Sequence, residues 1–291
     1  MKAIRTESLT KYYGTARGII DVNLNVDVGD FYGFIGPNGA GKSTTIRTLL
    51  GLIQKTSGNA EILGKTVGVN TQSILSDIGY LPSETTFYNS MTVAELLRLS
   101  AKLRGASCDG ERKILCERLD LDTTKKIKNL SFGNRKKVGI VCALQHNPKL
   151  LILDEPTSSL DPLMQREFYN ILGERNEQGA TIFLSSHVLS EVGKYCKKAA
   201  VIREGRILVE DTVEKLAHTG IKRVTVKGRI ELPQSDKVRD VETEQDQTSF
   251  LYSGDAKELI EYIRILCPDD FSVSDPDLEE VFMHYYKKEE R

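Results

Sequence analysis

A glycine-rich run near the start of the chain carries residue types that bind phosphate. Residues 36–43 read GPNGAGKS and match the phosphate-binding pattern GxxxxGK[ST]. Glycines let the backbone turn its N–H groups toward phosphate oxygens, where a Cβ would collide. We therefore expect Lys42 to meet the β- and γ-phosphates of a nucleotide and the Ser43 hydroxyl to ligate Mg²⁺. The loop residues expected to contact the nucleotide are Gly36, Asn38, Gly39, Ala40, Gly41, Lys42, Ser43 and Thr44.

Two adjacent acids follow an apolar run farther along the chain. The run, Leu150–Leu153, is typical of a buried parallel strand, and Asp154 and Glu155 come directly after it. Ligands bind at the carboxyl edge of open α/β sheets. Asp154 is therefore placed to hold Mg²⁺ through its water shell, and Glu155 to polarise the attacking water. Adjacent carboxylates are often just a solvated strand end, but beside a phosphate loop we favour a catalytic site.

The elements around the glycine loop fit its chemistry. Phe31–Ile35 before it is aromatic and apolar, as a buried strand would be. The helix expected after the loop presents its positive dipole end to the same anion. Its apolar residues recur at helical spacing, at Ile46, Leu49, Leu50 and Ile53.

A third motif lies between the loop and the acids. Residues 130–134 read LSFGN, which resembles the LSGGQ signature of the ATPase subunits of ATP-binding cassette (ABC) transporters. The resemblance implies that Ser131 and Gly133 of one subunit cap the ATP held by the loop of another. In this chain Phe132 replaces the first glycine of the family signature, and Asn134 replaces its glutamine. We expect these two differences to affect how tightly the second subunit holds the ATP. After this motif we expect a helix through Leu144.

Further positions match the same family. Tyr13 matches the aromatic residue that stacks on adenine, with Tyr12 as an adjacent competitor. Ser158–Asp161 resembles the family's SGLD loop, and Asp161 is expected both to act across a dimer interface and to cap the following helix. His187, just past an apolar strand, matches the switch histidine that contacts the γ-phosphate.

One family residue is missing. A glutamine that helps to ligate Mg²⁺ normally follows the strand at Ile78–Leu81, but this chain has Ser83 and Glu84 there. Ser83 has a shorter reach, so a water molecule or Glu84 is an alternative ligand.

The resemblance implies an α/β fold: a P-loop NTPase core with an N-terminal antiparallel β subdomain, a helical subdomain carrying the signature, and a small C-terminal α+β appendage. We place the ATPase domain at 1–218, its helical subdomain at about 84–137 and the appendage at 219–291. In the helical part, a capping box at Thr92–Glu95 precedes a stripe of Leu96, Leu97 and Leu103, and Gly105 ends the helix. A hairpin turn is expected at Glu204–Arg206.

The appendage shows strand and helix patterns. Val224–Val226 and Ser249–Tyr252 are predicted strands separated by a polar stretch, and Ala256–Leu266 is a predicted amphipathic helix. Its apolar side is expected to contain Leu259, Ile260, Ile263 and Leu266. The ending at Asp275–Phe282 resembles the closing segment of bacterial exporter subunits for drugs, peptides or lipids.

Composition limits the partners. The 291 residues carry a net charge of -1, so no basic field predicts binding to nucleic acid. Five scattered cysteines, with no CxxC pair, favour reduced thiols in a cytosolic protein. The opening residues lack the apolar region of a signal peptide, so we expect none, and no run approaches the roughly 20 apolar residues that span a bilayer. Any membrane role is therefore expected through a partner.

We interpret the chain as an ATP-binding and ATP-hydrolysing subunit of an ABC exporter, held at the cytoplasmic face of the cell membrane by transmembrane subunits. It would act as a homodimer or with another ATPase subunit, using ATP and Mg²⁺. The alternative is a soluble ABC ATPase or a nucleotide-dependent sensor without transport. Ribosomal members of the family usually have two cassettes in a chain, whereas this chain has one. Chromosomal members have a long coiled coil between the two nucleotide motifs, and this chain has no heptad run between Ser43 and Asp154.

Overall fold

The chain forms two compact units, Met1–Glu210 and Asp211–Arg291. The computed structural model describes residues 1–68, 71–105, 107–217, 221–228, 232–233, 235–244 and 246–274. The predicted boundary at residues 218 and 219 and the predicted closing segment Asp275–Phe282 lie outside the described residues.

A six-stranded sheet is the centre of the first unit, in the order β11-β10-β4-β9-β8-β7. Neighbouring strands from β10 to β7 run parallel. The predicted hairpin turn joins β10 to β11, with left-handed φ angles of 50° at Glu204 and 77° at Gly205. The strands are β4 (Phe31–Ile35), β7 (Ile78–Leu81), β8 (Leu150–Asp154), β9 (Thr181–Ser186), β10 (Lys198–Arg203) and β11 (Arg206–Thr212).

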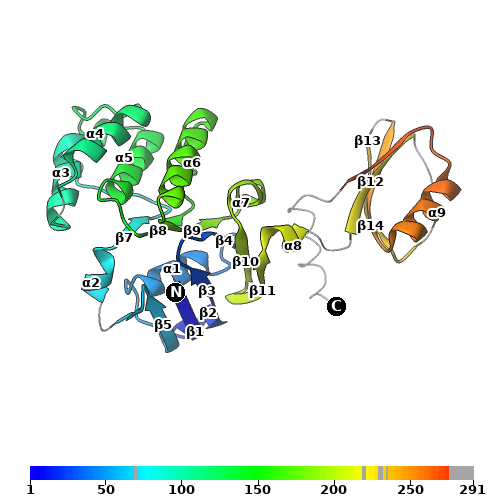
Figure 1. Ribbon diagram of the computed structural model, residues 1–291, viewed down its shortest axis with the longest axis horizontal. Coiled ribbons are helices and arrows are strands. Elements are labelled where there is room, and N and C mark those ends of the chain that lie inside the picture. Colours follow the sequence, from blue (N-terminus) through cyan, green and yellow to red (C-terminus); the bar gives the residue numbers. More distant parts are fainter. Residues whose placement is uncertain are drawn as a thin grey trace. The chain divides into compact units, whose positions relative to one another are not determined.

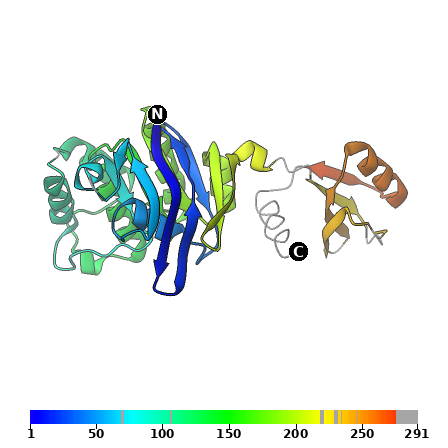
Figure 2. The ribbon, with the colours of Figure 1, turned by 90° about the horizontal axis from the view of Figure 1, so that it is seen from below.

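An antiparallel sheet, β2-β1-β5-β6 with β3 also pairing β1, forms the predicted N-terminal β subdomain. Figure 2 shows β1 and β2 running side by side as long strands. The strands are β1 (Lys2–Tyr13), β2 (Ala16–Val22), β3 (Asn25–Asp27), β5 (Ser57–Ile62) and β6 (Lys65–Thr66).

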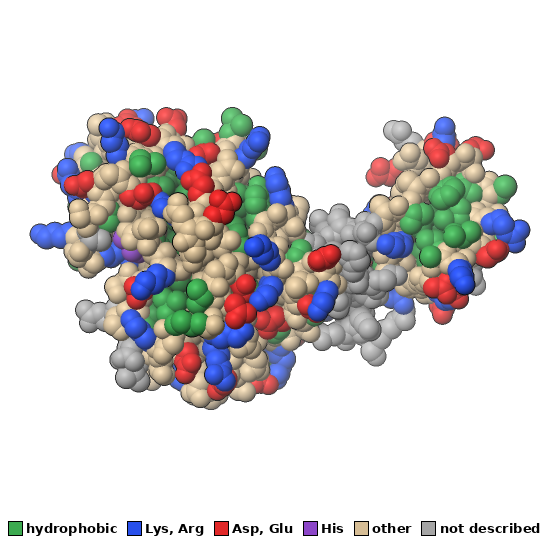
Figure 3. All heavy atoms as spheres, viewed as in Figure 1, with side chains coloured by type: hydrophobic (Ala, Val, Ile, Leu, Met, Phe, Trp, Pro, Cys, Tyr) green, Lys and Arg blue, Asp and Glu red, His purple; other side chains and the backbone are tan. Residues whose placement is uncertain are grey.

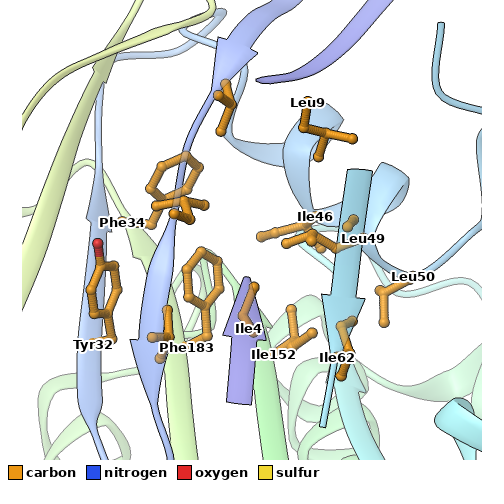
Figure 4. Packing of buried hydrophobic residues seen from close by; sticks show 14 of the residues in the cluster. Ile4, Leu9, Tyr32, Phe34, Ile46, Leu49, Leu50, Ile62, Ile152 and Phe183 are labelled. Carbon is orange, nitrogen blue, oxygen red and sulfur yellow. The ribbon is translucent and has the colours of Figure 1, made fainter. Parts of the chain in front are cut away.

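Helix α1 (Lys42–Leu49) packs between the two sheets and fixes the glycine loop before it (Figure 4). Its Ile46 and Leu49 join one core with Ile62 of the antiparallel sheet and Phe183 of the parallel sheet. Burying such side chains stabilises the fold by about 1.5–3 kcal/mol each. The prediction that Ile53 belongs to this helix is wrong, because Gly51 turns the chain with φ of 66° just after the helix ends.

The helices α3 to α6 lie on one side of the parallel sheet, and the antiparallel strands lie on the other (Figure 1). The predicted capping box is present: the Thr92 hydroxyl accepts from the Glu95 N–H at 3.2 Å, and the Glu95 carboxylate accepts from the Thr92 N–H at 2.8 Å. Leu103 lines the same groove as Leu96 but is 79% exposed, so the predicted stripe is buried only at Leu96 and Leu97. The remaining helices of this unit are α2 (Thr71–Leu75), α3 (Val93–Leu103), α4 (Asp109–Arg118), the 3₁₀ helix Ile127–Asn129, α5 (Phe132–Leu144), α6 (Pro162–Glu177) and α7 (Leu189–Tyr195).

The second unit is an α+β structure whose antiparallel sheet has the order β13-β14-β12-β15. The predicted helix has the predicted bounds and buries Leu259 and Ile263. Ile260 is 65% exposed, so its placement on the buried side was wrong. The polar stretch between the two predicted strands contains a further strand, β13. The elements are α8 (Val213–Ala217), β12 (Ile221–Lys227), β13 (Val238–Glu244), β14 (Gln247–Ser253), α9 (Ala256–Leu266) and β15 (Phe271–Ser274).

The surface agrees with the nearly neutral composition. Basic and acidic side chains are intermixed over the visible face of the first unit (Figure 3). All five cysteines have free thiols. Within the described ranges, no helix has the length and apolar character needed to cross a membrane.

Candidate functional site

The glycine loop connects β4 to α1 in a conformation that requires glycine. Gly39 and Gly41 have φ angles of 80° and 110°, which L side chains rarely adopt. A Cβ on Gly36 would collide with the Ile202 carbonyl oxygen. The loop therefore leaves its backbone open beside the N-terminus of α1, where orphan N–H groups favour anions.

A cavity of about 270 Å³ opens at this loop. Most of the predicted nucleotide-binding residues line it, namely Tyr13, Asn38, Gly39, Gly41, Lys42, Ser43 and Thr44. The structure thus places Tyr13 at the cavity instead of Tyr12, and the Lys11 ammonium lies 5.3 Å from the Tyr13 ring centroid. Gly36 and Ala40 shape the loop without lining the cavity.

Three lining residues have no assigned role in the sequence motifs. Arg17 and Gly18 lie on β2, just past the turn from Tyr13, and Ser83 follows β7. The Arg17 guanidinium pairs with Glu204 at 2.7 Å. Arg17 and Gly18 belong to no motif, and their nearness to Tyr13 in sequence was the one available signal. Ser83 had a signal in the sequence as well, because it follows the strand where the family has a glutamine.

Glu155 also lines the cavity and joins two predicted site residues. Its Oε1 lies 3.1 Å from Lys42 Nζ, and its Oε2 lies 2.6 Å from His187 Nδ1. Lys42 also donates to the carbonyls of Gly36 at 2.5 Å and Pro37 at 3.2 Å. The structure therefore brings a buried lysine, a carboxylate and an imidazole together at one edge of the sheet.

Asp154 is fully buried at the end of β8. Its Oδ1 accepts a hydrogen bond from the Ser185 hydroxyl at 2.6 Å, and its Oδ2 has no partner among the described residues. A buried carboxylate oxygen without a hydrogen-bond partner suits a hard cation that takes oxygen ligands. The free oxygen of Asp154 therefore fits Mg²⁺, which is usually bound by one or two protein carboxylates alongside phosphate and water. The described residues contain no cluster of three or more acidic, histidine or cysteine ligands.

The signature turn lies outside this cavity. Ser131 caps α5, its hydroxyl accepting from the Asn134 N–H at 3.3 Å. A Cβ on Gly133 would lie 2.7 Å from the Ser159 carbonyl oxygen, so glycine permits the close approach of these two loops. Asp161 caps α6 as predicted, accepting from the Met164 N–H at 3.0 Å. The cavity at Lys42 is not lined by Ser131, Gly133 or Asp161.

A glycine loop between a buried parallel strand, β4, and a helix, together with acids at the end of β8, two strands away in the same sheet, defines a P-loop nucleotide-binding ATPase. Residues 19–158 match the family model described as ABC transporter. The chain is 38% identical over 262 residues to the bacitracin transport ATP-binding protein BcrA of Bacillus licheniformis, covering 86% of this chain and 85% of that one. The chain belongs to the family of ABC transporter ATP-binding subunits, and it is an ATPase of that type.

Two further similarities agree with this membership. The linearmycin resistance ATP-binding protein LnrL of Bacillus subtilis is 31% identical over 234 residues, covering 77% of this chain and 75% of that one. A solved structure described as the ATP binding subunit of an ABC transporter is 31% identical, with a TM-score of 0.69, covering 74% of this chain and 91% of that one.

Proposed function

We propose that the chain powers an exporter of drugs, peptides or lipids, working with a second copy of itself and with partner membrane subunits. The observation that carries the proposal is the position of Glu155, between Lys42 and His187 at the cavity wall. Relatives named for bacitracin transport and linearmycin resistance support export over import.

The chemistry follows from the side chains at the cavity. The loop N–H groups and Lys42 hold the triphosphate, and Tyr13 stacks on the adenine. Glu155 orients the attacking water, while His187 steadies Glu155 and the γ-phosphate. Ser43 and Asp154 would hold Mg²⁺, which would supply positive charge at the phosphates.

The second copy completes the site. Ser131, Gly133 and Asp161 lie away from the cavity of their own chain, so in our proposal they serve the nucleotide of the other copy. The N-terminus of α5 at Ser131 suits a γ-phosphate, because its N–H groups and dipole favour anions. Hydrolysis then weakens the contact and lets the pair reopen, which moves the attached membrane subunits.

An apolar groove of about 600 Å³ is the proposed docking site for a helix of the membrane subunit. It lies between the helical part and the sheet, and Leu52, Tyr88 and Leu103 line it with largely exposed side chains. Exposed apolar side chains gathered in one groove are typical of a docking surface. Docking there would place the chain at the cytoplasmic face of the cell membrane.

The test measures how the full-length chain divides between membrane and soluble fractions in cells. The double variant Leu52→Glu, Leu103→Glu should lose about 10-fold or more of the membrane-bound fraction, because charges in the groove oppose apolar docking. Ile114→Glu, at a half-exposed position of α4 outside the groove, should stay membrane-bound. A wild-type chain found entirely in the soluble fraction, or a groove variant that stays bound, would favour a soluble ATPase or sensor.

A further inference from the structure

A buried lysine outside the nucleotide-binding motifs connects the signature helix to the cavity wall. Lys136, in the second turn of α5, is 3% exposed, and its Nζ donates to the backbone carbonyls of Pro82 at 3.2 Å and Ser83 at 3.0 Å. A lysine ammonium is costly to bury, and most surface lysines keep it in water. A buried ammonium aimed at two carbonyls of one loop therefore ties that loop to α5.

The same face of α5 packs closely on the segment that leads to Ser83. A Cβ on Gly139 would lie 2.8 Å from both the Leu81 and the Thr85 side chains, and a Cβ on Gly79 would collide with the Ala143 carbonyl oxygen. Lys136, Gly139 and Ala143 recur at helical spacing. Helix α5 is thus in contact with β7 and with the segment that follows it along two turns.

Lys136 is also within electrostatic reach of the catalytic acids. Burial lowers the pKa of Lys136 to about 8, and the charges of Asp154 and Glu155 oppose that shift. Ser83, whose carbonyl Lys136 holds, lines the cavity together with Lys42 and Glu155. Lys136 itself does not line the cavity, so its ammonium acts on the cavity wall through Ser83.

We propose that Lys136 is a positioning residue that couples nucleotide in the Lys42 cavity to the placement of the Ser131 turn of the same chain. Ser131 caps α5 five residues before Lys136. A nucleotide that moves the Ser83 wall would move the start of α5 through the two carbonyl bonds. The coupling rests on the proposed function, in which the Ser131 turn acts on the nucleotide of a second copy.

The test is hydrogen exchange of the full-length chain, diluted until it is monomeric, with and without a non-hydrolysable ATP analogue and Mg²⁺. In the wild type the analogue should slow exchange in the loop at 36–43 and change exchange at 131–138. Lys136→Met, which keeps the apolar stem, should retain the first effect and lose the second. Lys137→Met is the matched control, since this neighbouring buried lysine makes neither carbonyl bond, and it should behave as the wild type.

Kinetics supply a second readout. Lys136→Met should lower kcat for ATP by about 10-fold or more while changing the monomer's Kd for the analogue less than about twofold, because Lys136 touches no bound phosphate. If Lys136→Met does not fold, Lys136→Gln, which keeps one shorter amide donor, replaces it in both measurements.

The outcomes separate the two proposals. No protection at 36–43 in the wild type would contradict the proposed ATP site. Protection there without a change at 131–138, or a change that persists in Lys136→Met, would overturn the role of Lys136 alone.

Discussion

In the proposed mechanism the chemistry depends on Glu155, whose backbone is strained. Its φ of 49° lies in the left-handed region, which costs a non-glycine residue about 1–2 kcal/mol. Its N–H is held by the carbonyl and hydroxyl oxygens of Ser185, at 3.2 and 3.3 Å. The strain turns the carboxylate away from the path of β8, toward Lys42 and His187.

Replacing His187 tests whether that orientation matters. His187→Ala removes the 2.6 Å contact with Glu155, so kcat for ATP should fall by about 10²-fold or more, as for other positioned acid–base groups. The affinity for ATP should change little, because the loop and Lys42 are intact. Phosphate release measures kcat and nucleotide titration measures Kd. An unchanged kcat would remove His187 from the site.

At the scale of single residues, the sequence predicted which motif residues the structure places around the cavity. The glycine loop, Asp154 and Glu155 follow directly on apolar runs, so their chemistry is readable from order alone. Lys136 could not be predicted, because it reaches Ser83 through a contact between segments far apart in the chain, and Arg17 had only its nearness to Tyr13 as a signal.

The elements around the site are held at distances that small residues permit. Helix α5 lies against β7 because Gly79 leaves room for the Ala143 carbonyl. Just past α5, the His146 Nε2 donates to the Ile78 carbonyl at 3.2 Å, and burial lowers the pKa of His146 to about 4, so its ring is neutral near pH 7. These contacts set the position of the signature helix relative to the sheet.

Two glycine substitutions test this spacing in opposite directions. Gly79→Ala should lower the free energy of unfolding by about 1–3 kcal/mol, because the added methyl group overpacks the α5–β7 contact. Gly173→Ala, in the middle of α6 where a Cβ would meet nothing within 4 Å, should raise it by about 0.5–1 kcal/mol. Urea unfolding measures both. Equal effects of the two substitutions would show that Gly79 has no packing role.

Elements with local signals were predicted well. The structure confirms the start of α3 at its capping box and the start of α6 at its Asp161 cap. It also confirms both ends of α9, which the spacing of its apolar residues predicted. Leu103 and Ile260 are exposed because an apolar residue at helical spacing is buried only if another element covers that side, and no element in the described ranges covers these two side chains.

At the scale of the whole molecule, the sequence predicted an ATPase part and a smaller α+β part, and each unit has its own core. The strand β13 was missed because exposed residues make up almost all of it, so it shows no alternation of apolar and polar residues. The proposed contribution of a second copy belongs to this scale, since the signature turn does not line the cavity of its own chain.

The most direct test of a nucleotide held between two copies is the sedimentation of Glu155→Gln with saturating ATP and Mg²⁺. This variant keeps the nearly isosteric side chain but loses the negative charge that activates water, so ATP should bind, remain intact and hold the copies together. We predict a dimer with ATP and a monomer when Lys42→Ala is added to the same variant. A chain that binds ATP yet sediments as a monomer at every concentration would contradict the shared site.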